Sequence, residues 1–194
     1  MGELKDFLEL ASLMVTEPRS GVLLALLVTA AVIDVRRHRI PNWLTLSGTA
    51  FGLLYSAFVP FFMDHGFLWS LGGWAIGFGL LFPFWLMRIM GAGDVKLMAM
   101  AGALLGVTGV IPAILASFVA GGVLAVGYSI QHGRFRNMLG NVGRFLHLGG
   151  VAAMCGMPVR MAASGWQSVG KIPFGLAIAT GTIATVVATN FNLF

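Results

Sequence analysis

The sequence has little charge for its length. Charged residues make up 10% of the 194 residues and hydrophobic residues 58%. A water-soluble domain of ordinary composition carries about 25% charged residues. Too little polar surface is available here to cover a globule in water, so we expect lipid to surround most of the chain. The length predicts a single domain spanning 1–194.

Acidic residues are especially scarce, and none follows Asp94. Any carboxylate chemistry must therefore come from a set of seven: Glu3, Asp6, Glu9, Glu17, Asp34, Asp64 and Asp94. Glu3, Asp6 and Glu9 lie opposite apolar residues at helical spacing, namely Leu4, Phe7, Leu8 and Ala11, which predicts an amphipathic N-terminal segment at 1–17 on the membrane surface.

The sequence also lacks the residues of several common sites. A single cysteine, Cys155, excludes an intrachain disulfide and a Cys-x-x-Cys zinc site. The four histidines do not have metal-ligand spacing. Gly-x-Ser-x-Gly and His-Glu-x-x-His motifs, typical of serine hydrolases and zinc proteases, do not occur. We therefore expect no metal and no cofactor.

Long apolar runs are abundant. A helix that crosses a membrane needs about 20 consecutive, mostly apolar residues. The predicted spans are 18–35, 43–59, 67–89, 95–107, 110–130 and 172–189. The fourth is too short to cross alone, so we expect neighbouring helices to shield it. The predicted fold class is all-α: a polytopic membrane helix bundle with about six transmembrane helices.

The basic residues predict the orientation, because they favour the cytoplasmic side of a membrane. Lys5 and Arg19 fall on one side of the predicted spans, and the other basic residues fall on the opposite side: Arg36, Arg37, Arg39, Arg88, Lys96, Arg134, Arg136, Arg144, Arg160 and Lys171. Both termini should therefore lie on the outer, periplasmic side, and 131–171 should form a basic cytoplasmic connection.

Asp34 and Asp94 stand apart from the other acids, because both fall at the predicted cytoplasmic membrane boundary. Ionisable residues within or beside spans are costly and are usually functional. Two carboxylates held close together do not both ionise readily, so one can act as a general base and the other as a general acid. Such a pair can activate water against a peptide carbonyl.

Each aspartate also has a purely structural interpretation. Asp34 could pair with Arg37 or His38 one helical turn on, and Asp94 could be the N-cap of the fourth span. Small residues four apart favour close packing of membrane helices rather than a site. This spacing occurs in the pairs Gly48/Gly52, Gly73/Gly77 and Gly102/Gly106.

Residues 91–96 have the sequence Gly-Ala-Gly-Asp-Val-Lys, which resembles the Gly-x-Gly-Asp-x-Lys motif of the type IV prepilin peptidases. Residues 33–42, in which Asp34 precedes a basic stretch and Ile-Pro-Asn, resemble that family's first aspartate region. Residues 171–175, Lys-Ile-Pro-Phe-Gly, resemble the opening of its last helix. The three stretches occur in the family's order.

The resemblance implies a membrane-embedded aspartyl endopeptidase that removes the basic leader from prepilins at the cytoplasmic face, with Asp34 and Asp94 as the catalytic pair. It implies residues that shape the site or bind substrate: Gly91, Gly93, Lys96, Pro41, Asn42 and Pro173. Larger members carry a Cys-x-x-Cys domain and N-methylate the new pilin terminus. This chain is similar to the minimal peptidases of tight-adherence (Flp) pilus systems, so we do not expect methyltransferase activity.

The expected location is the bacterial inner membrane, and the expected partners are the lipid bilayer and a prepilin with a basic leader and an apolar helix. Membrane topology explains the basic loops, so we expect no nucleic-acid partner; the oligomeric state stays open. Two alternatives have different activities. A small proton-coupled transporter would move solute without cleaving a substrate, and a non-enzymatic assembly subunit of a secretion system would tolerate loss of both carboxylates.

Overall fold

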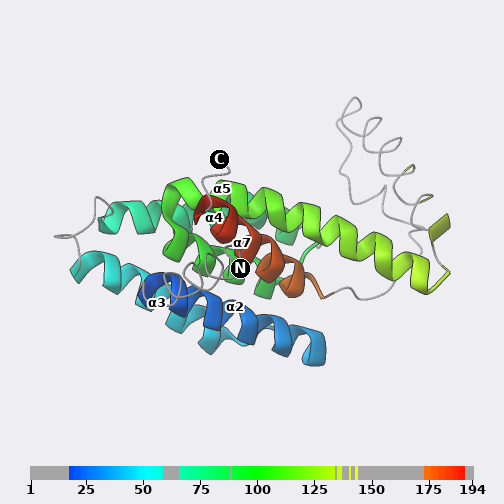
Figure 1. Cartoon of the computed structure of the whole chain (residues 1–194), viewed down its shortest axis with the longest axis horizontal. Coiled ribbons are helices and arrows are strands. Elements are labelled where there is room, and N and C mark those ends of the chain that lie inside the picture. Colours follow the sequence, from blue (N-terminus) through cyan, green and yellow to red (C-terminus); the bar gives the residue numbers. More distant parts are fainter. Residues whose placement is uncertain are drawn as a thin grey trace, which may run out of the picture. The chain divides into compact units, whose positions relative to one another are not determined.

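A computed structural model describes residues 18–58, 66–87, 89–133, 135–136, 140, 143 and 173–190. Every regular element in these ranges is a helix, which confirms the predicted all-α class (Figure 1). The helices are α2 (Pro18–Arg37), α3 (Asn42–Phe58), α4 (Phe67–Leu86), α5 (Ala92–Gln131) and α7 (Phe174–Asn190).

The chain divides into two compact units, Met1–Gly121 with Pro173–Phe194 and Gly122–Ile172. The helices and contacts that build the candidate site belong to the first unit. The predicted amphipathic segment at 1–17 and nearly all of the predicted connection at 131–171 lie outside the described residues, so both stay predictions, as does the single peptidase domain.

The predicted spans agree in position with the helices. By length and composition α2, α4 and α5 could each cross a membrane, and α7 is a shorter apolar helix. The number of crossings and the side of the termini stay predictions. The predicted spans at 95–107 and 110–130 correspond to the two parts of α5, which Gly106 interrupts.

Gly106 breaks α5 because its backbone has φ +69° and ψ −172°, a conformation that residues with a side chain rarely adopt. A Cβ atom at Gly102 would lie 3.0 Å from Cγ2 of Val110. In a straight helix, eight residues would separate these positions by about 12 Å. The chain therefore folds back at Gly106, as Figure 1 shows for the green part of the ribbon.

The part of α5 before Gly106 is the centre of the first unit. Leu97, Met98 and Met100 have no exposed surface, and Leu27 of α2 and Ile178 of α7 belong to the same buried cluster. Apolar side chains from neighbouring helices thus surround this short segment, which confirms the expected shielding. The arrangement holds the start of α5, with Asp94, in a fixed place.

Glycines allow α4 to approach this central segment closely. A Cβ atom at Gly77 would lie 2.7 Å from the carbonyl oxygen of Met98, and one at Gly73 would overlap the backbone of Gly102. On α3, a Cβ atom at Gly52 would lie 3.2 Å from the backbone of Ala103. The interpretation of these glycines as close packing positions is confirmed.

We expect Gly73→Ala to destabilise the protein, because the added methyl group has only rigid backbone to push against. Overpacking of this kind costs about 1–3 kcal/mol. The control is Gly79→Ala on the same helix, where a Cβ meets no atom within 4 Å. Thermal unfolding in detergent should show a lower midpoint for Gly73→Ala alone. Equal midpoints for the two variants would contradict the packing argument.

Arg19, in the first turn of α2, contacts residues of α3, α4 and α5. Its Nη2 donates hydrogen bonds to Oγ of Ser56 (2.6 Å) and to the carbonyl oxygen of Ala103 (3.2 Å), and its guanidinium lies 4.7 Å from the ring centre of Trp69. Ser70 donates to the same Ala103 carbonyl. Carbonyl groups in the last turn of a helix lack partners within the helix, and this end carries partial negative charge. The arginine therefore stabilises the break in α5.

Candidate active site

Asp34 lies in the last turn of α2, with only 5% of its surface exposed. Its Oδ2 accepts a hydrogen bond of 2.8 Å from the backbone N–H of Gly175, in the first turn of α7. The first turn of a helix has free N–H groups and partial positive charge, both of which favour a carboxylate. The start of α7 therefore fixes the position of the Asp34 side chain.

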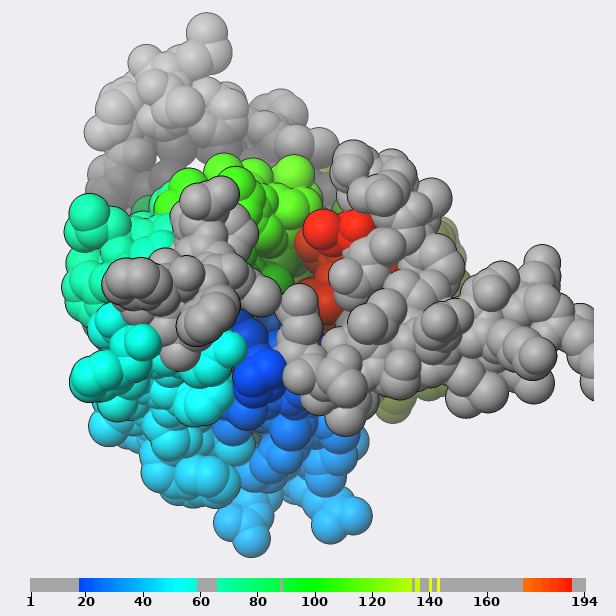
Figure 2. Space-filling model, turned by 60° about the vertical axis from the view of Figure 1, so that its left-hand side comes forward, coloured from blue at the N-terminus to red at the C-terminus, as the bar shows by residue number. Residues whose placement is uncertain are grey.

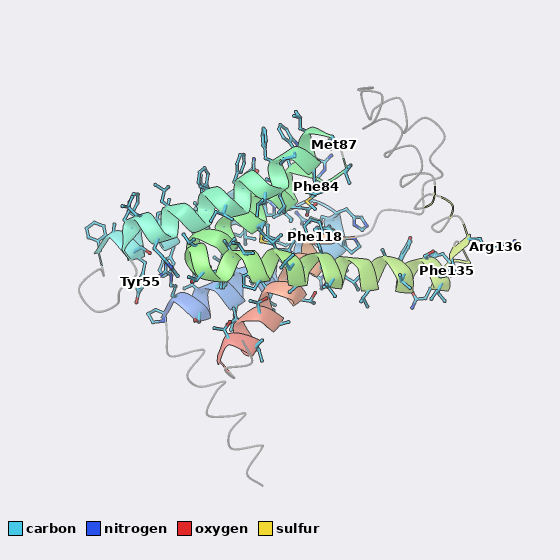
Figure 3. All side chains as sticks on the ribbon, turned by 90° about the horizontal axis from the view of Figure 1, so that it is seen from above. Tyr55, Phe84, Met87, Phe118, Phe135 and Arg136 are labelled. Atoms are coloured by element: carbon cyan, nitrogen blue, oxygen red, sulfur yellow. The ribbon has the colours of Figure 1, made fainter. Side chains whose placement is uncertain are left out.

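Aromatic packing holds the start of α7 in place. Pro173 immediately precedes the helix, and its fixed φ suits a helix start. The ring of Phe174 lies 6.1 Å from that of Phe118, which lies 5.6 Å from that of Phe84 (Figure 3). A Cβ at Gly121 would come within 2.7 Å of the Phe174 ring, so glycine leaves room for it. The contacts anchor α7 to α4 and α5.

Asp94 lies in the first turn of α5 and is partly buried. Its Oδ2 accepts a hydrogen bond of 3.3 Å from the backbone N–H of Gly91, immediately before the helix. An acidic side chain at the third helical position commonly reaches back in this way. The alternative that Asp94 is itself the N-cap is wrong, because the helix begins at Ala92. A bond of this kind fixes the carboxylate without using all of its acceptor capacity.

The two aspartates come from separate helices, and contacts of Gly93 with Ile40 and of Lys96 with Asn42 hold the start of α5 against the connection that follows α2. The backbone N–H of His38 donates a hydrogen bond of 2.7 Å to the carbonyl oxygen of Asp34. The burial of Asp34 and the partial burial of Asp94 place the pair at the edge of the helix bundle, with one carboxylate covered and the other accessible.

Three more of the predicted site residues, Pro41, Asn42 and Lys96, lie in or contact the segment where α2 leads into α3. His38 has φ +49° just after α2, and Pro41 accepts a hydrogen bond of 3.2 Å from the N–H of Leu44 as α3 begins. Oδ1 of Asn42 accepts a hydrogen bond of 2.9 Å from Nζ of Lys96. The α2–α3 connection is thereby attached to the first turns of α5.

Gly93 shows how tightly these segments meet. A Cβ atom at Gly93 would lie 3.2 Å from Cβ of Ile40 and 3.6 Å from its backbone nitrogen. The Gly-x-Gly-Asp stretch therefore packs directly on the Ile-Pro-Asn stretch. The three stretches singled out in the sequence, at 33–42, 91–96 and 171–175, are in contact around the two aspartates in the part of each that the structure describes.

Two residues of the site were part of the sequence motifs but were not selected as candidate site residues. Gly175 supplies the N–H group that holds Asp34, and Ile40 supplies the surface on which Gly93 packs. The Pro-Phe-Gly stretch contained the signal for the first, although only Pro173 was selected from it. Within the described ranges, no group of three or more His, Cys, Asp or Glu residues is arranged to hold a metal ion.

Comparisons with known proteins agree with the sequence motifs. Residues 21–126 match the Type IV leader peptidase family. Over 125 residues the chain is 34% identical to the prepilin leader peptidase/N-methyltransferase of Xanthomonas campestris pv. campestris, a match that covers 59% of this chain and 42% of that protein. The chain therefore matches less than half of the relative's length. No solved structure matches the chain.

Proposed function

The chain belongs to the type IV leader peptidase family, and from this premise we propose that it is a membrane-embedded aspartyl endopeptidase acting on prepilins. In this proposal Asp34 and Asp94 form the catalytic pair, the substrates are Flp-like prepilins with a basic leader, and cleavage occurs at the cytoplasmic face of the bacterial inner membrane.

The observation that best supports the proposal is the meeting of three separate stretches at the aspartates. Gly175 donates to Asp34, and Lys96 donates to Asn42 close to Asp94. A bundle that needed only stability would not require two carboxylates at the same place, because neighbouring carboxylates repel one another. The arrangement suits hydrolysis, in which the same two groups exchange roles as acid and base.

The proposed reaction needs one water molecule and the two side chains. The ionised carboxylate takes a proton from water as the water oxygen attacks the carbonyl carbon of the scissile peptide bond. The protonated carboxyl supplies a proton to the departing amine, the C–N bond breaks, and a new carboxyl terminus and a new amino terminus result. Positioned acid–base groups contribute about 10²–10⁴-fold to the rate.

The distribution of charge supports the proposed cytoplasmic side of the membrane. Arg36, Arg37 and Arg39 lie exposed beside Asp34, and Lys96 is exposed beside Asp94. Basic residues at membrane boundaries favour the cytoplasmic side. A prepilin with a basic leader and an apolar membrane helix would present the junction between the two at this same boundary.

The proposal is tested by reconstituting the purified wild-type protein in liposomes with a tagged Flp-type prepilin. We expect the prepilin to shorten and mass spectrometry to show one new amino terminus, without a methyl group. Failure to cleave any prepilin across a panel of Flp-type sequences would overturn the proposal. Movement of solute without cleavage would favour the transporter alternative, and neither activity would favour an assembly subunit.

We expect Lys96→Glu to lower kcat/KM on a prepilin about tenfold, which corresponds to about 1.4 kcal/mol. The substitution removes the donor to Asn42 and places a further carboxylate near the two aspartates. Lys96→Arg, which keeps the charge, is the control and should lose much less. Unchanged turnover by Lys96→Glu on the same substrate would remove Lys96 from the proposed site.

A further inference from the structure

A groove of about 530 Å³ lies between α3 and α4 and has Lys96 and Asn42 among its lining residues. Ligand pockets in proteins commonly measure about 300–1,000 Å³. Figure 2 shows α3 in light blue to cyan and α4 in turquoise as adjoining surfaces. The groove thus connects the vicinity of Asp94 with the apolar flank of the helix bundle.

The α3 wall of the groove follows one face of a helix. The residues that line it are Thr45 and Leu46, then Thr49, then Leu53, so successive turns of the helix each contribute to the wall. From Asn42 to Leu53 the chain advances about 16 Å, because a helix rises 1.5 Å per residue. The groove is therefore about three helical turns long, and its length runs parallel to α3.

The opposite wall and the floor are apolar. Leu71, Trp74 and Phe78 of α4 line the groove at helical spacing, and Ala99 of the central α5 segment lies at its base. Trp74 and Phe78 stack with ring centres 5.6 Å apart, which gives this wall a continuous aromatic surface. An occupant that fits must be apolar along about three turns and polar at the end that reaches Lys96.

The other cavity near the site has a different chemistry. It measures about 730 Å³ and is lined by Arg36, Arg37 and Arg39, by Asn42, and by apolar residues of α2, the α2–α3 connection and the start of α3. Its three guanidinium groups would repel a basic leader, and covering them with an apolar helix would remove charged groups from water at a cost. Of these two cavities, the groove between α3 and α4 is the one that combines an apolar length with a polar end at Asn42 and Lys96.

We propose that the groove between α3 and α4 binds the apolar membrane helix of the substrate, with the end of that helix beside Lys96 and its scissile bond at the aspartates. This inference rests on the proposed function. Helices associate within lipid through close packing and hydrogen bonds rather than through the hydrophobic effect. The walls provide apolar packing surfaces. The hydroxyls of Thr45 and Thr49 donate to the carbonyl oxygens of Asn42 and Thr45 and keep only acceptor capacity toward an occupant.

The test compares two neighbouring leucines of α3. Leu53 lines the groove, whereas Leu54 is 56% exposed and does not line it. We expect Leu53→Trp to fill part of the groove and raise the KM for a full-length Flp-type prepilin at least tenfold, with kcat changed less than twofold. Leu54→Trp should cleave like the wild type. Equal KM values for Leu53→Trp and the wild type would overturn the inference.

A second measurement does not depend on turnover or on the tolerance of Leu53 for tryptophan. A photo-crosslinking amino acid is placed at position 53 or 54 of an Asp94→Asn protein in liposomes that contain the prepilin. We expect position 53 to capture the apolar segment of the prepilin and position 54 to capture lipid. Capture of lipid alone from both positions would mean that the groove is an acyl-chain site and would overturn the inference.

The two proposals fail in distinguishable ways. A wild-type protein that cleaves no prepilin contradicts the proposed function whatever the crosslinks show. A wild-type protein that cleaves, together with a Leu53→Trp variant of unchanged KM, contradicts the groove alone.

Discussion

Asp34→Asn and Asp94→Asn are each expected to lower prepilin cleavage by about 10³-fold or more, because each removes one of the two groups that exchange protons in the proposed reaction. The asparagine amide neither takes nor gives a proton at neutral pH. These are the largest effects expected of any substitution in the chain, and they separate a peptidase from the non-enzymatic alternative.

The two substitutions are informative because they leave the surrounding hydrogen bonds intact. The side-chain oxygen of asparagine still accepts a hydrogen bond, so Asn at position 34 can accept from the N–H of Gly175 and Asn at position 94 from the N–H of Gly91. The packing of α7 on α2 and the first turn of α5 should persist. Loss of activity in a protein that inserts and unfolds like the wild type is then a loss of chemistry.

Cleavage is followed by gel shift and by the mass of the new amino terminus, with the wild type and both variants present in the membrane in equal amounts. The double variant should be no less active than either single variant, because residues that act as one unit are strongly non-additive. A variant that retains wild-type turnover would show that the chemistry lies elsewhere and would remove that aspartate from the catalytic pair.

The sequence predicted the helices well because the solvent is lipid. Apolar runs of nearly 20 residues leave few alternatives to helices in a bilayer, and α2, α3 and α4 begin within a residue of their predicted starts. The break within α5 was harder to place. Glycines at 102, 106 and 109 all fit a break. In the structure Gly106 is the one of the three with a positive φ, and it packs against Trp69.

The site was predictable only in part, because one of its main contacts is not local in the sequence. A carboxylate at the end of an apolar run is visible in the sequence, and so is a glycine-rich turn before Asp94. The hydrogen bond from Gly175 to Asp34 joins residues far apart in the chain and depends on how α7 packs against α2. No local pattern encodes such a contact, although the Pro-Phe-Gly stretch marked where its donor would be found.

Because Gly175 holds Asp34 by a hydrogen bond, Gly175→Ala is expected to have the second largest effect. It should lower kcat/KM by about 10²-fold, since displacement of a catalytic group by about 1 Å can cost that much. A Cβ at position 175 would lie 2.7 Å from Oδ2 and 3.0 Å from Cγ of Asp34. The carboxylate lies at the end of a short, rotatable side chain, so it should move rather than the backbone of α7. Activity should therefore fall far more than stability.

Three glycine-to-alanine substitutions separate this effect from damage to the fold. Gly73→Ala presses on the backbone of α5 and should lower the unfolding midpoint, Gly79→Ala meets no atom within 4 Å and should change neither property, and Gly175→Ala should change activity with little loss of stability. The measurements are kcat/KM on one prepilin and thermal unfolding of each variant. A Gly175→Ala protein with wild-type kcat/KM would mean that the start of α7 does not position Asp34 for catalysis. A loss of stability equal to that of Gly73→Ala would assign Gly175 to helix packing instead.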